Sequence, residues 1–207
     1  MSGGTISGNT GGGVSVGSGT FTMSSGTISG NSGGGVSVSG GTFTMDGGEI
    51  KNHTTTNSGG GVSVSGGTFT MNSGTISGNT SSGTSNGGGV YVASGTFTMY
   101  GGTISGNKAA NGGGVYNNGT FRVGKTAKVS GNTKIDGTTR SNAYITGSTY
   151  ITIGTGTNAP APGMEIWAQT ARADNVIAKD VGAVQAYFKA DEAGKLVVFD
   201  NGDLIIQ

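Results

Sequence analysis

The chain has 207 residues, of which glycine, threonine and serine together make up 98. Hydrophobic residues make up 32% and charged residues 10%, against about 45–50% and about 25% in ordinary globular domains. Eleven basic and ten acidic side chains leave a net charge of +1, so no basic field favours nucleic acid. Because there is no cysteine and no apolar run approaches the ~18–20 residues of a membrane helix, we expect no disulfide, no thiolate metal site and no membrane insertion.

Three short strings recur in a fixed order along the chain. The string Gly-Thr-Ile-Ser-Gly-Asn begins at Gly4, Gly26, Gly74 and Gly102. A Gly-Gly-Gly-Val string begins at Gly11, Gly33, Gly59, Gly87 and Gly112. A Gly-Thr-Phe-Thr-Met string begins at Gly19, Gly41, Gly67 and Gly95, with a degraded form at Gly119. Each repeat of about 22 to 28 residues therefore carries three short segments separated by glycine turns.

Large apolar residues alternate with small polar ones within each segment. In residues 20–23, Phe and Met alternate with two threonines, and in residues 36–38 two valines flank a serine. This period of two predicts strands with one buried face, whereas the glycine content disfavours helices. Three strands per coil predict an all-β parallel solenoid of triangular cross-section. Its core would hold ladders of equivalent residues: Ile6, Ile28, Ile50, Ile76 and Ile104; Val14, Val36, Val62, Val90 and Val115; Phe21, Phe43, Phe69, Phe97 and Phe121; and Met23, Met45, Met71 and Met99.

Asparagines at equivalent places predict a further ladder at one turn. We expect their side-chain amides to stack and to hydrogen-bond to one another. Asparagine also tolerates the left-handed backbone that we expect at this turn. The residues are Asn9, Asn31, Asn79 and Asn107. The segments between this turn and the triple glycine differ in length from coil to coil. The longer ones are predicted to emerge at one corner, where solenoids often elaborate binding surface.

The strings at residues 102–107 and 87–92 resemble the right-handed parallel β-helix repeats of bacterial cell-surface proteins. Adhesin-like and autotransporter-passenger-like solenoids carry such repeats, and they are related in shape to pectate lyases. The resemblance covers roughly residues 1–150 and implies a right-handed parallel β-helix at an extracellular or cell-surface location. It implies no single activity, because this scaffold serves adhesion, polysaccharide cleavage and phage tail spikes.

The second half of the chain differs in character from the first. Residues 1–107 hold three charged side chains and residues 108–207 hold 18. Two degraded coils are expected through Val129, Ile135, residues 144–145 and residues 150–153, and residues 197–199 and 204–206 predict a hairpin. The sequence thus predicts coils over residues 1–155 and a β-rich cap over residues 156–207. At the other end Met1 enters in mid-coil, so we expect that edge to be continued by further coils or covered by a partner.

One segment matches a nucleotide-binding motif by its letters. Residues 119–126 fit the phosphate-loop pattern Gly-x4-Gly-Lys-Thr. That loop works because it joins a buried strand to the N-terminus of a helix, where phosphates bind. Here residues 120–123 align with a solenoid strand and no helical pattern follows, so we expect a degenerate coil and no cofactor.

A small charged cluster interrupts the neutral coils at Asp46, Glu49, Lys51 and His53. Acid–base catalysis is conceivable there, because Glu49 and Lys51 share a face. The predicted coil neighbours of Glu49 are threonines, however, so no second carboxylate completes a paired-acid or calcium site. A single histidine makes no metal site. The cluster is therefore predicted to be an exposed Glu–Lys pair without catalytic activity.

Outward threonines form the largest regular surface that the sequence predicts. On a strand, residues i and i+2 lie about 6.6–6.8 Å apart and neighbouring coils about 4.8 Å apart, which gives a lattice of hydroxyl and methyl groups. This lattice resembles the ice-binding faces of solenoid antifreeze proteins, although threonine is also an ordinary strand former. Exposed tyrosines could stack on sugar rings. The possible binding surface comprises Thr20, Thr22, Thr42, Thr44, Thr68, Thr70, Thr96, Thr98, Tyr91 and Tyr116.

These features predict a non-enzymatic segment of a secreted or surface-anchored bacterial protein. It would act as an adhesin stalk or as a binding surface for a host or matrix glycan or protein. Ice binding through the threonine lattice is the first alternative. A carbohydrate-active enzyme, lyase or hydrolase, or a module like a phage tail spike is the second.

Overall fold

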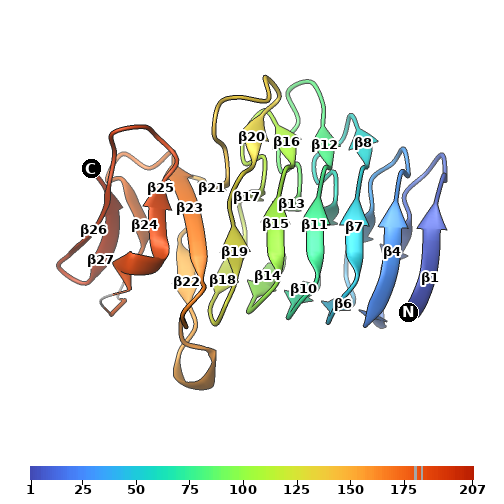
Figure 1. Ribbon diagram of the computed structural model, residues 1–207, viewed down its shortest axis with the longest axis horizontal. Coiled ribbons are helices and arrows are strands. Elements are labelled where there is room, and N and C mark those ends of the chain that lie inside the picture. Colours follow the sequence, from blue (N-terminus) through green and yellow to red (C-terminus); the bar gives the residue numbers. More distant parts are fainter. Residues whose placement is uncertain (180, 183) are drawn as a thin grey trace.

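The computed structural model describes residues 1–179, 181–182 and 184–207, and Figure 1 shows them as a stack of coils with the termini at opposite ends. Parallel strands form a β-solenoid of about seven turns, with 46% of the residues in strands. Two 3-10 turns, Gly156–Asn158 and Gln185–Tyr187, are the helical elements of the described residues. The predicted all-β parallel solenoid is confirmed.

Each coil contributes a strand to each of three faces. Face 1 holds the Thr-Ile-Ser segments: β1 (Ser2–Ser7), β4 (Ser25–Ser29), β7 (Glu49–Lys51), β11 (Thr75–Ser77), β15 (Thr103–Ser105) and β19 (Lys128–Val129). Face 2 holds the segments after the triple glycine: β2 (Val14–Val16), β5 (Val36–Val38), β9 (Val62–Val64), β13 (Val90–Val92), β17 (Val115–Asn117) and β21 (Ala143–Ile145). Face 3 holds the Thr-Phe-Thr-Met segments: β3 (Thr20–Met23), β6 (Thr42–Met45), β10 (Thr68–Met71), β14 (Thr96–Met99), β18 (Thr120–Val123) and β22 (Ile151–Ile153).

Each of the longer coils has a fourth short strand, whereas the sequence predicts only three strands per coil. These strands lie at the corner between faces 1 and 2 and form their own parallel sheet: β8 (Thr54–Thr55), β12 (Thr80–Ser81), β16 (Lys108–Ala109) and β20 (Thr133–Lys134). Segments of two residues such as Thr54–Thr55 show no apolar alternation, so periodicity could not reveal them. They form because the lengthened corners stack on one another.

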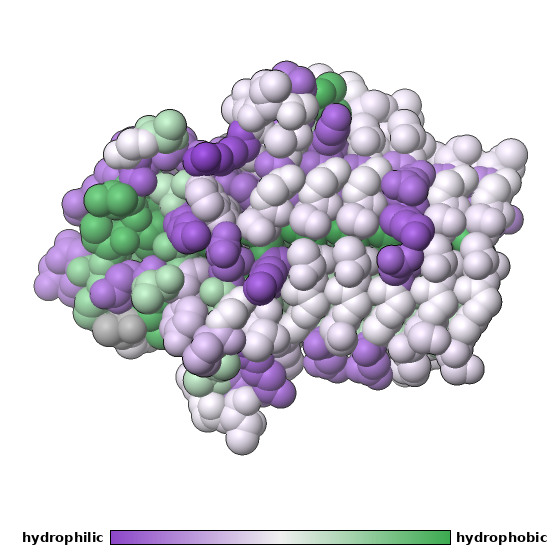
Figure 2. Space-filling model, viewed as in Figure 1, coloured by the Kyte–Doolittle hydropathy of each residue, from purple (hydrophilic) through white to green (hydrophobic). Residues whose placement is uncertain are grey.

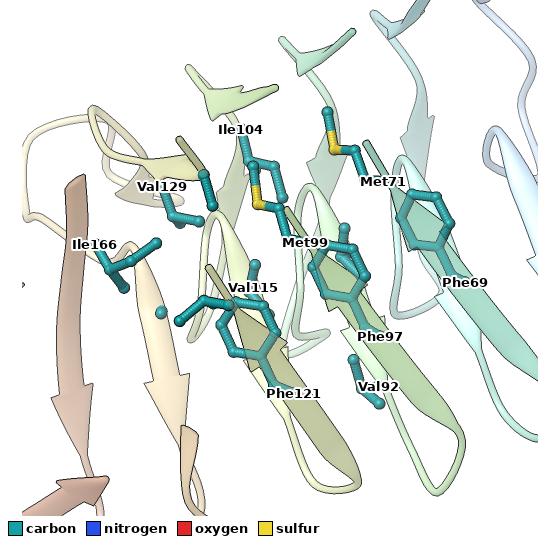
Figure 3. Packing of buried hydrophobic residues seen from close by; sticks show 14 of the residues in the cluster. Phe69, Met71, Val92, Phe97, Met99, Ile104, Val115, Phe121, Val129 and Ile166 are labelled. Carbon is teal, nitrogen blue, oxygen red and sulfur yellow. The ribbon is translucent and has the colours of Figure 1, made fainter. Parts of the chain in front are cut away.

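Equivalent residues of successive coils pair in strict register, and the pairing builds the predicted ladders. Phe69 pairs with Phe43 and with Phe97, and the three rings stack with centroids 4.8 Å apart. Ile76 pairs likewise with Ile50 and Ile104. Figure 3 shows the phenylalanine and methionine side chains of neighbouring coils lying one behind the other inside the solenoid. Members at the edge of the stack, Ile6, Val14 and Phe21, are half-buried because a coil covers them on one side only.

Glycine is required where coils approach most closely. At Gly35, an added Cβ would lie 2.4 Å from the carbonyl oxygen of Gly61, on the backbone of the next coil. At Gly78, which precedes Asn79 of the asparagine ladder, φ is +66°. This left-handed conformation is unfavourable for residues other than glycine. These two needs explain why glycine recurs at fixed places in the repeat.

The predicted asparagine ladder is present and is longer than expected. The side chain Nδ2 of Asn79 donates to Oδ1 of Asn107 at 2.9 Å, and Nδ2 of Asn107 donates to Oδ1 of Asn132 at 2.9 Å. The members after Asn9 are buried: Asn31, His53, Asn79, Asn107, Asn132 and Asn142. The expected left-handed backbone was wrong for these members. For all of them except Asn142, the positive φ belongs to the preceding residue, such as Gly78 or Asn52. The side chain can therefore turn inward from an ordinary backbone.

Beyond residue 155 the strands change partners. β23 (Glu165–Thr170) pairs with β19 through its first residues and with β21 through its last, so faces 1 and 2 meet in one sheet. β25 (Phe188–Ala190) pairs in parallel with β23, and β24 (Val176–Ala178) pairs with β22. The predicted hairpin is present as β26 (Val197–Asp200) and β27 (Asp203–Ile206), which adds antiparallel to β24. Whether residue 155 divides two domains stays a prediction.

Ile135 does not contribute to the interior of its coil. Its side chain is 41% exposed, whereas the other expected members Val129, Ile145 and Ile151 are buried. Ile135 follows β20, in the loop through which the chain leaves the corner before it returns to face 2. The register of that coil therefore could not be read from apolar residues alone.

Candidate binding surface

The outward threonines of face 3 form the lattice that the sequence predicts. Each pairs with its equivalent in the next coil, in two rows: Thr20, Thr42, Thr68 and Thr96; and Thr22, Thr44, Thr70 and Thr98. The stacked phenylalanine rings beneath, 4.8 Å apart in the central coils, show the coil spacing. Thr120 continues the first row, whereas Arg122 interrupts the second. What this lattice binds stays a prediction.

Access to the lattice changes along the stack. Thr20 and Thr22 are exposed and most others are half-buried, but Thr98 is only 7% exposed. The expectation that Thr98 is presented to solvent is therefore wrong. Its next neighbour in the row is the long Arg122 instead of another threonine, and a long side chain can lie over a short one. The usable lattice lies in the coils before Thr98.

Tyrosines form a separate row on face 2, along β13, β17 and β21. The rings of Tyr91 and Tyr116 are 5.5 Å apart, and those of Tyr116 and Tyr144 are 5.3 Å apart with planes 6° from parallel. Because Tyr116 stacks on both Tyr91 and Tyr144, its ring faces are covered and the expected stacking on a sugar ring was wrong for this residue. Tyr91 has Ser63 on its other side, and whether it contacts a sugar stays a prediction. Burial raises the pKa of Tyr116, with added effects of Tyr144 and Tyr91, so its hydroxyl stays protonated. The row presents ring edges and hydroxyl groups instead.

The charged cluster of the third coil is divided in the structure. Lys51 Nζ lies 2.5 Å from Glu49 Oε2, and the coil neighbours of Glu49 are the expected Thr27 and Thr75. His53 points inward instead and is fully buried in the asparagine ladder. The pair is therefore a half-exposed ion pair with hydroxyl neighbours.

The ring of His53 takes the place that asparagine holds in other coils. Its Nδ1 accepts a hydrogen bond from the backbone N–H of Asn31 at 3.0 Å, and its Nε2 lies 3.1 Å from the carbonyl oxygen of Ile28. Its own backbone N–H donates to Oδ1 of Asn79. Burial lowers the pKa of His53, and the nearby backbone carbonyl groups of Asn31 and Ile28 oppose this shift. The sequence analysis missed this role. The available signal was that Lys51-Asn52-His53 aligns with the Ser-Gly-Asn of the other repeats, which places His53 at the asparagine position.

The segment that matches the phosphate-loop pattern forms no such loop. Its residues Thr120–Val123 are strand β18, and Lys125 and Thr126 lead directly into β19. Nζ of Lys125 lies over the ring of Tyr100 at 5.6 Å from its centroid. No helix follows the segment, so the anion-binding geometry of a helix N-terminus is lacking there.

Charged and aromatic side chains gather at the C-terminal end, a surface that sequence analysis did not single out. Figure 2 shows the coils as mostly pale, with strongly hydrophilic and hydrophobic patches towards that end, on the left. Trp167 of β23 lies between Arg140 and Lys189, whose cationic groups are 4.8 Å and 5.1 Å from the ring centroid. Glu165 accepts a hydrogen bond from Trp167 Nε1 and pairs with Lys189. The only tryptophan of the chain was the available clue.

Comparison with known proteins adds no relative: no family model, no curated protein and no solved structure matches the chain. Among residues 1–179, 181–182 and 184–207, no group of three or more His, Cys, Asp or Glu side chains could hold a metal ion. The same residues include no helix long and apolar enough to cross a membrane. The arrangement of the faces thus remains the basis for any functional argument.

Proposed function

We propose that the chain is a non-enzymatic rod of a secreted or surface-anchored bacterial protein, which acts as an adhesin stalk and binds glycans or proteins along its faces. The observation that carries this proposal is the strict register of the outward hydroxyl rows. In the central coils, Thr68 and Thr70 each repeat in line with the coils on both sides. A ligand with repeated hydroxyl groups can hydrogen-bond to such a row at several points.

The rigidity of the rod supports the same function. Backbone hydrogen bonds join every coil to the next, and the stacked Phe, Ile and Val ladders fill the interior. A surface that is ordered before binding loses little conformational entropy on contact, which favours weak, repeated interactions. The N-terminal edge, with half-buried Ile6 and Phe21, would accept a further coil or a partner in the same parallel register.

Binding of the labelled chain to an array of glycans and extracellular matrix proteins tests this function. We expect saturable binding to at least one class, and weaker binding after Thr44→Glu with Thr70→Glu, which place two charges in the hydroxyl row of face 3. Ser37→Glu with Ser63→Glu provides the matched control on face 2. Loss in only one double variant identifies the face. If the wild-type chain binds nothing above an inert protein, the proposal is wrong.

Ice binding is a second candidate, and the same in-register lattice is the observation that favours it. A flat lattice would be disrupted by one bulky outward residue, and Thr68→Tyr projects a ring over it without changing the inward Phe69. Thermal hysteresis of both proteins is the measurement. We expect none in either, because Arg122 interrupts the lattice and Thr98 is covered. Hysteresis that Thr68→Tyr abolishes would favour ice over adhesion.

A further inference from the structure

A trough at the C-terminal end of the solenoid carries chemistry that differs from that of the coil faces. One hollow of about 560 Å³ is lined by residues that include Lys134, Thr138, Thr139, Arg140, Gln169 and Glu192. Two smaller hollows of about 310 and 290 Å³ share Arg140 with it, and both also contact Trp167. We call these three hollows around Arg140 the Arg140 trough. Its walls come from the corner loop after β20, from β23 and from the residues after β25.

Stacking holds the guanidinium of Arg140 in place. Its carbon lies 4.8 Å from the ring centroid of Trp167, and the ring is itself fixed by the hydrogen bond from Nε1 to Glu165 Oε1 at 2.5 Å. A guanidinium stacked in this way keeps the donors on its edges free for another partner. A side chain that is restricted by stacking before a ligand arrives loses less entropy when the ligand binds.

Two of the acidic groups around the trough already have other partners. Both carboxylate oxygens of Asp191 accept hydrogen bonds at 2.6 Å, one from the backbone N–H of Asn142 and one from its Nδ2. Glu165 pairs with Lys189 at 3.6 Å. Within the part of the chain that the structure describes, no carboxylate lies within ion-pair distance of Arg140 or Lys134. These two cations face the hollow without a salt bridge, although the buried carboxylate of Asp191 attracts Arg140 electrostatically. Exposed Glu192 is the other acid in the lining.

We propose that the Arg140 trough binds the carboxylate of an acidic sugar at the end of a glycan chain. This inference rests on the proposed binding function and names its ligand class. The fork of Arg140 would hold the carboxylate through two parallel hydrogen bonds, and Lys134 would add a second positive charge. Thr138 supplies a hydroxyl group suited to sugar hydroxyls. The hydroxyl of Thr139 already donates to Asp136 and Nε2 of Gln169 to Ser141, so these two residues would offer their oxygens as acceptors. A hollow of about 560 Å³ favours a chain end over a polymer that passes along the face.

Fluorescence of Trp167 measures binding directly, because it is the only tryptophan and lies against Arg140. Titration with sialyllactose should give a saturable change, and neutral lactose at the same concentration should give none. Arg140→Ala should weaken binding about tenfold or more. Arg140→Lys should retain only part of the wild-type affinity, because an ammonium group cannot form the two parallel hydrogen bonds of a guanidinium. Arg122→Ala, an exposed arginine on face 3, is the matched control and should bind like the wild type.

Circular dichroism and melting temperature check that the variants remain folded, and Lys134→Ala provides an independent variant with an expected several-fold loss. An equal response to lactose, an unchanged affinity in Arg140→Ala, or preference for an acidic peptide over the sugar would overturn the proposal. Its failure is distinguishable from failure of the binding function. Array binding that survives Arg140→Ala, with no response to sialyllactose, rejects the trough alone, whereas an array without any bound ligand rejects the wider function.

Discussion

Aromatic side chains show how differently the two halves of this molecule are held together. In the repeat coils, Phe43, Phe69 and Phe97 stack on their own equivalents with centroids 4.8 Å apart. Near the C-terminus, Trp167 lies between two cations, and Tyr150 has the guanidinium of Arg172 4.0 Å from its centroid. The first arrangement arises wherever one sequence repeats in register. The second requires a particular partner for each ring, supplied by residues that occur once.

This difference also explains the distribution of charge. Identical residues at equivalent positions lie within one coil spacing of each other, so a charged repeat would place like charges side by side. The first 107 residues accordingly contain only three charged side chains, all in one coil, where Glu49 and Lys51 form an ion pair. The C-terminal half holds 18 charged residues because its coils differ from one another. Recognition of charged ligands is therefore expected there.

Removing a central ring from a ladder should have the largest effect on stability. Phe69→Ala deletes a fully buried ring with stacked neighbours on both sides, and we expect a loss of about 3–5 kcal/mol in the free energy of unfolding. Phe21→Ala, at the half-buried edge of the same ladder, should lose clearly less. Urea denaturation of both variants checks this. Equal losses would show that position within the ladder has no importance.

Removing the end of the asparagine ladder should have the next largest effect. Asp191→Ala leaves two buried donors of Asn142 without acceptors, and we expect a loss of about 1–3 kcal/mol. Glu192→Ala removes the adjacent, exposed carboxylate and should change stability by less than about 0.5 kcal/mol. The same denaturation experiment compares them. Similar small effects would mean that the ladder needs no terminal acceptor.

Acidification should weaken the ladder at His53. Burial lowers the pKa of the folded histidine below 6.5, so as the pH falls below about 6.5 the unfolded chain binds a proton that the folded chain resists. Stability from this group is thus complete above about pH 6.5 and is lost as the pH falls through the lower folded pKa. The melting temperature of the wild type should drop more between about pH 8 and about pH 5 than that of His53→Asn, which restores the residue of the other coils.

Other groups contribute to the same pH range, and the comparison with His53→Asn removes them. Burial raises the pKa of Asp191, so that its proton is favoured in the folded chain and its contribution has the opposite sign. Hydrogen bonding to Arg172 lowers the pKa of Asp174 to about 2, which affects stability only in stronger acid. Identical pH dependence in the wild type and His53→Asn would contradict a role for the histidine. Near pH 8 the two should differ by less than about 1 kcal/mol.

The smallest effect is expected at the Glu49–Lys51 pair. Glu49→Gln should change stability by about 0–1 kcal/mol, because an exposed pair gains little in water. Pectin and related polysaccharides should remain uncleaved by both proteins, since threonines flank Glu49 on both coils. Chromatography of the polymer after incubation measures this. Cleavage by the wild type that Glu49→Gln abolishes would show that this coil is catalytic.

Most of the repeat architecture could be predicted from the sequence because each strand pairs with a copy of itself. The alternation in residues 20–23 predicts which side chains face inward, and the recurrence of the string predicts that Phe21 meets Phe43. The threonine rows follow from the same argument. Thr98 shows the limit of this argument, because it is buried where the repeat predicts an outward threonine, beside Arg122 of the next coil.

The C-terminal surface could not be predicted in this way. Asp191 completes the asparagine ladder from 49 residues away, and it is an aspartate that no repeat places there. Arg140 and Trp167 meet only because β23 pairs with both face 1 and face 2 and brings Trp167 to the corner loop that carries Arg140. Neither contact has an equivalent in an earlier coil that would reveal it.

The sequence by itself determined the solenoid, its three faces, the buried ladders and the neutral outward rows. The periodicity was sufficient to predict these features, because in a stack of coils each residue contacts the equivalent residue of the next coil. Only the tertiary structure decided the corner sheet, the inward turn of His53 and the contacts of Arg140. These join positions that are not equivalent in the repeat, and such contacts depend on the path of the backbone and on side-chain length.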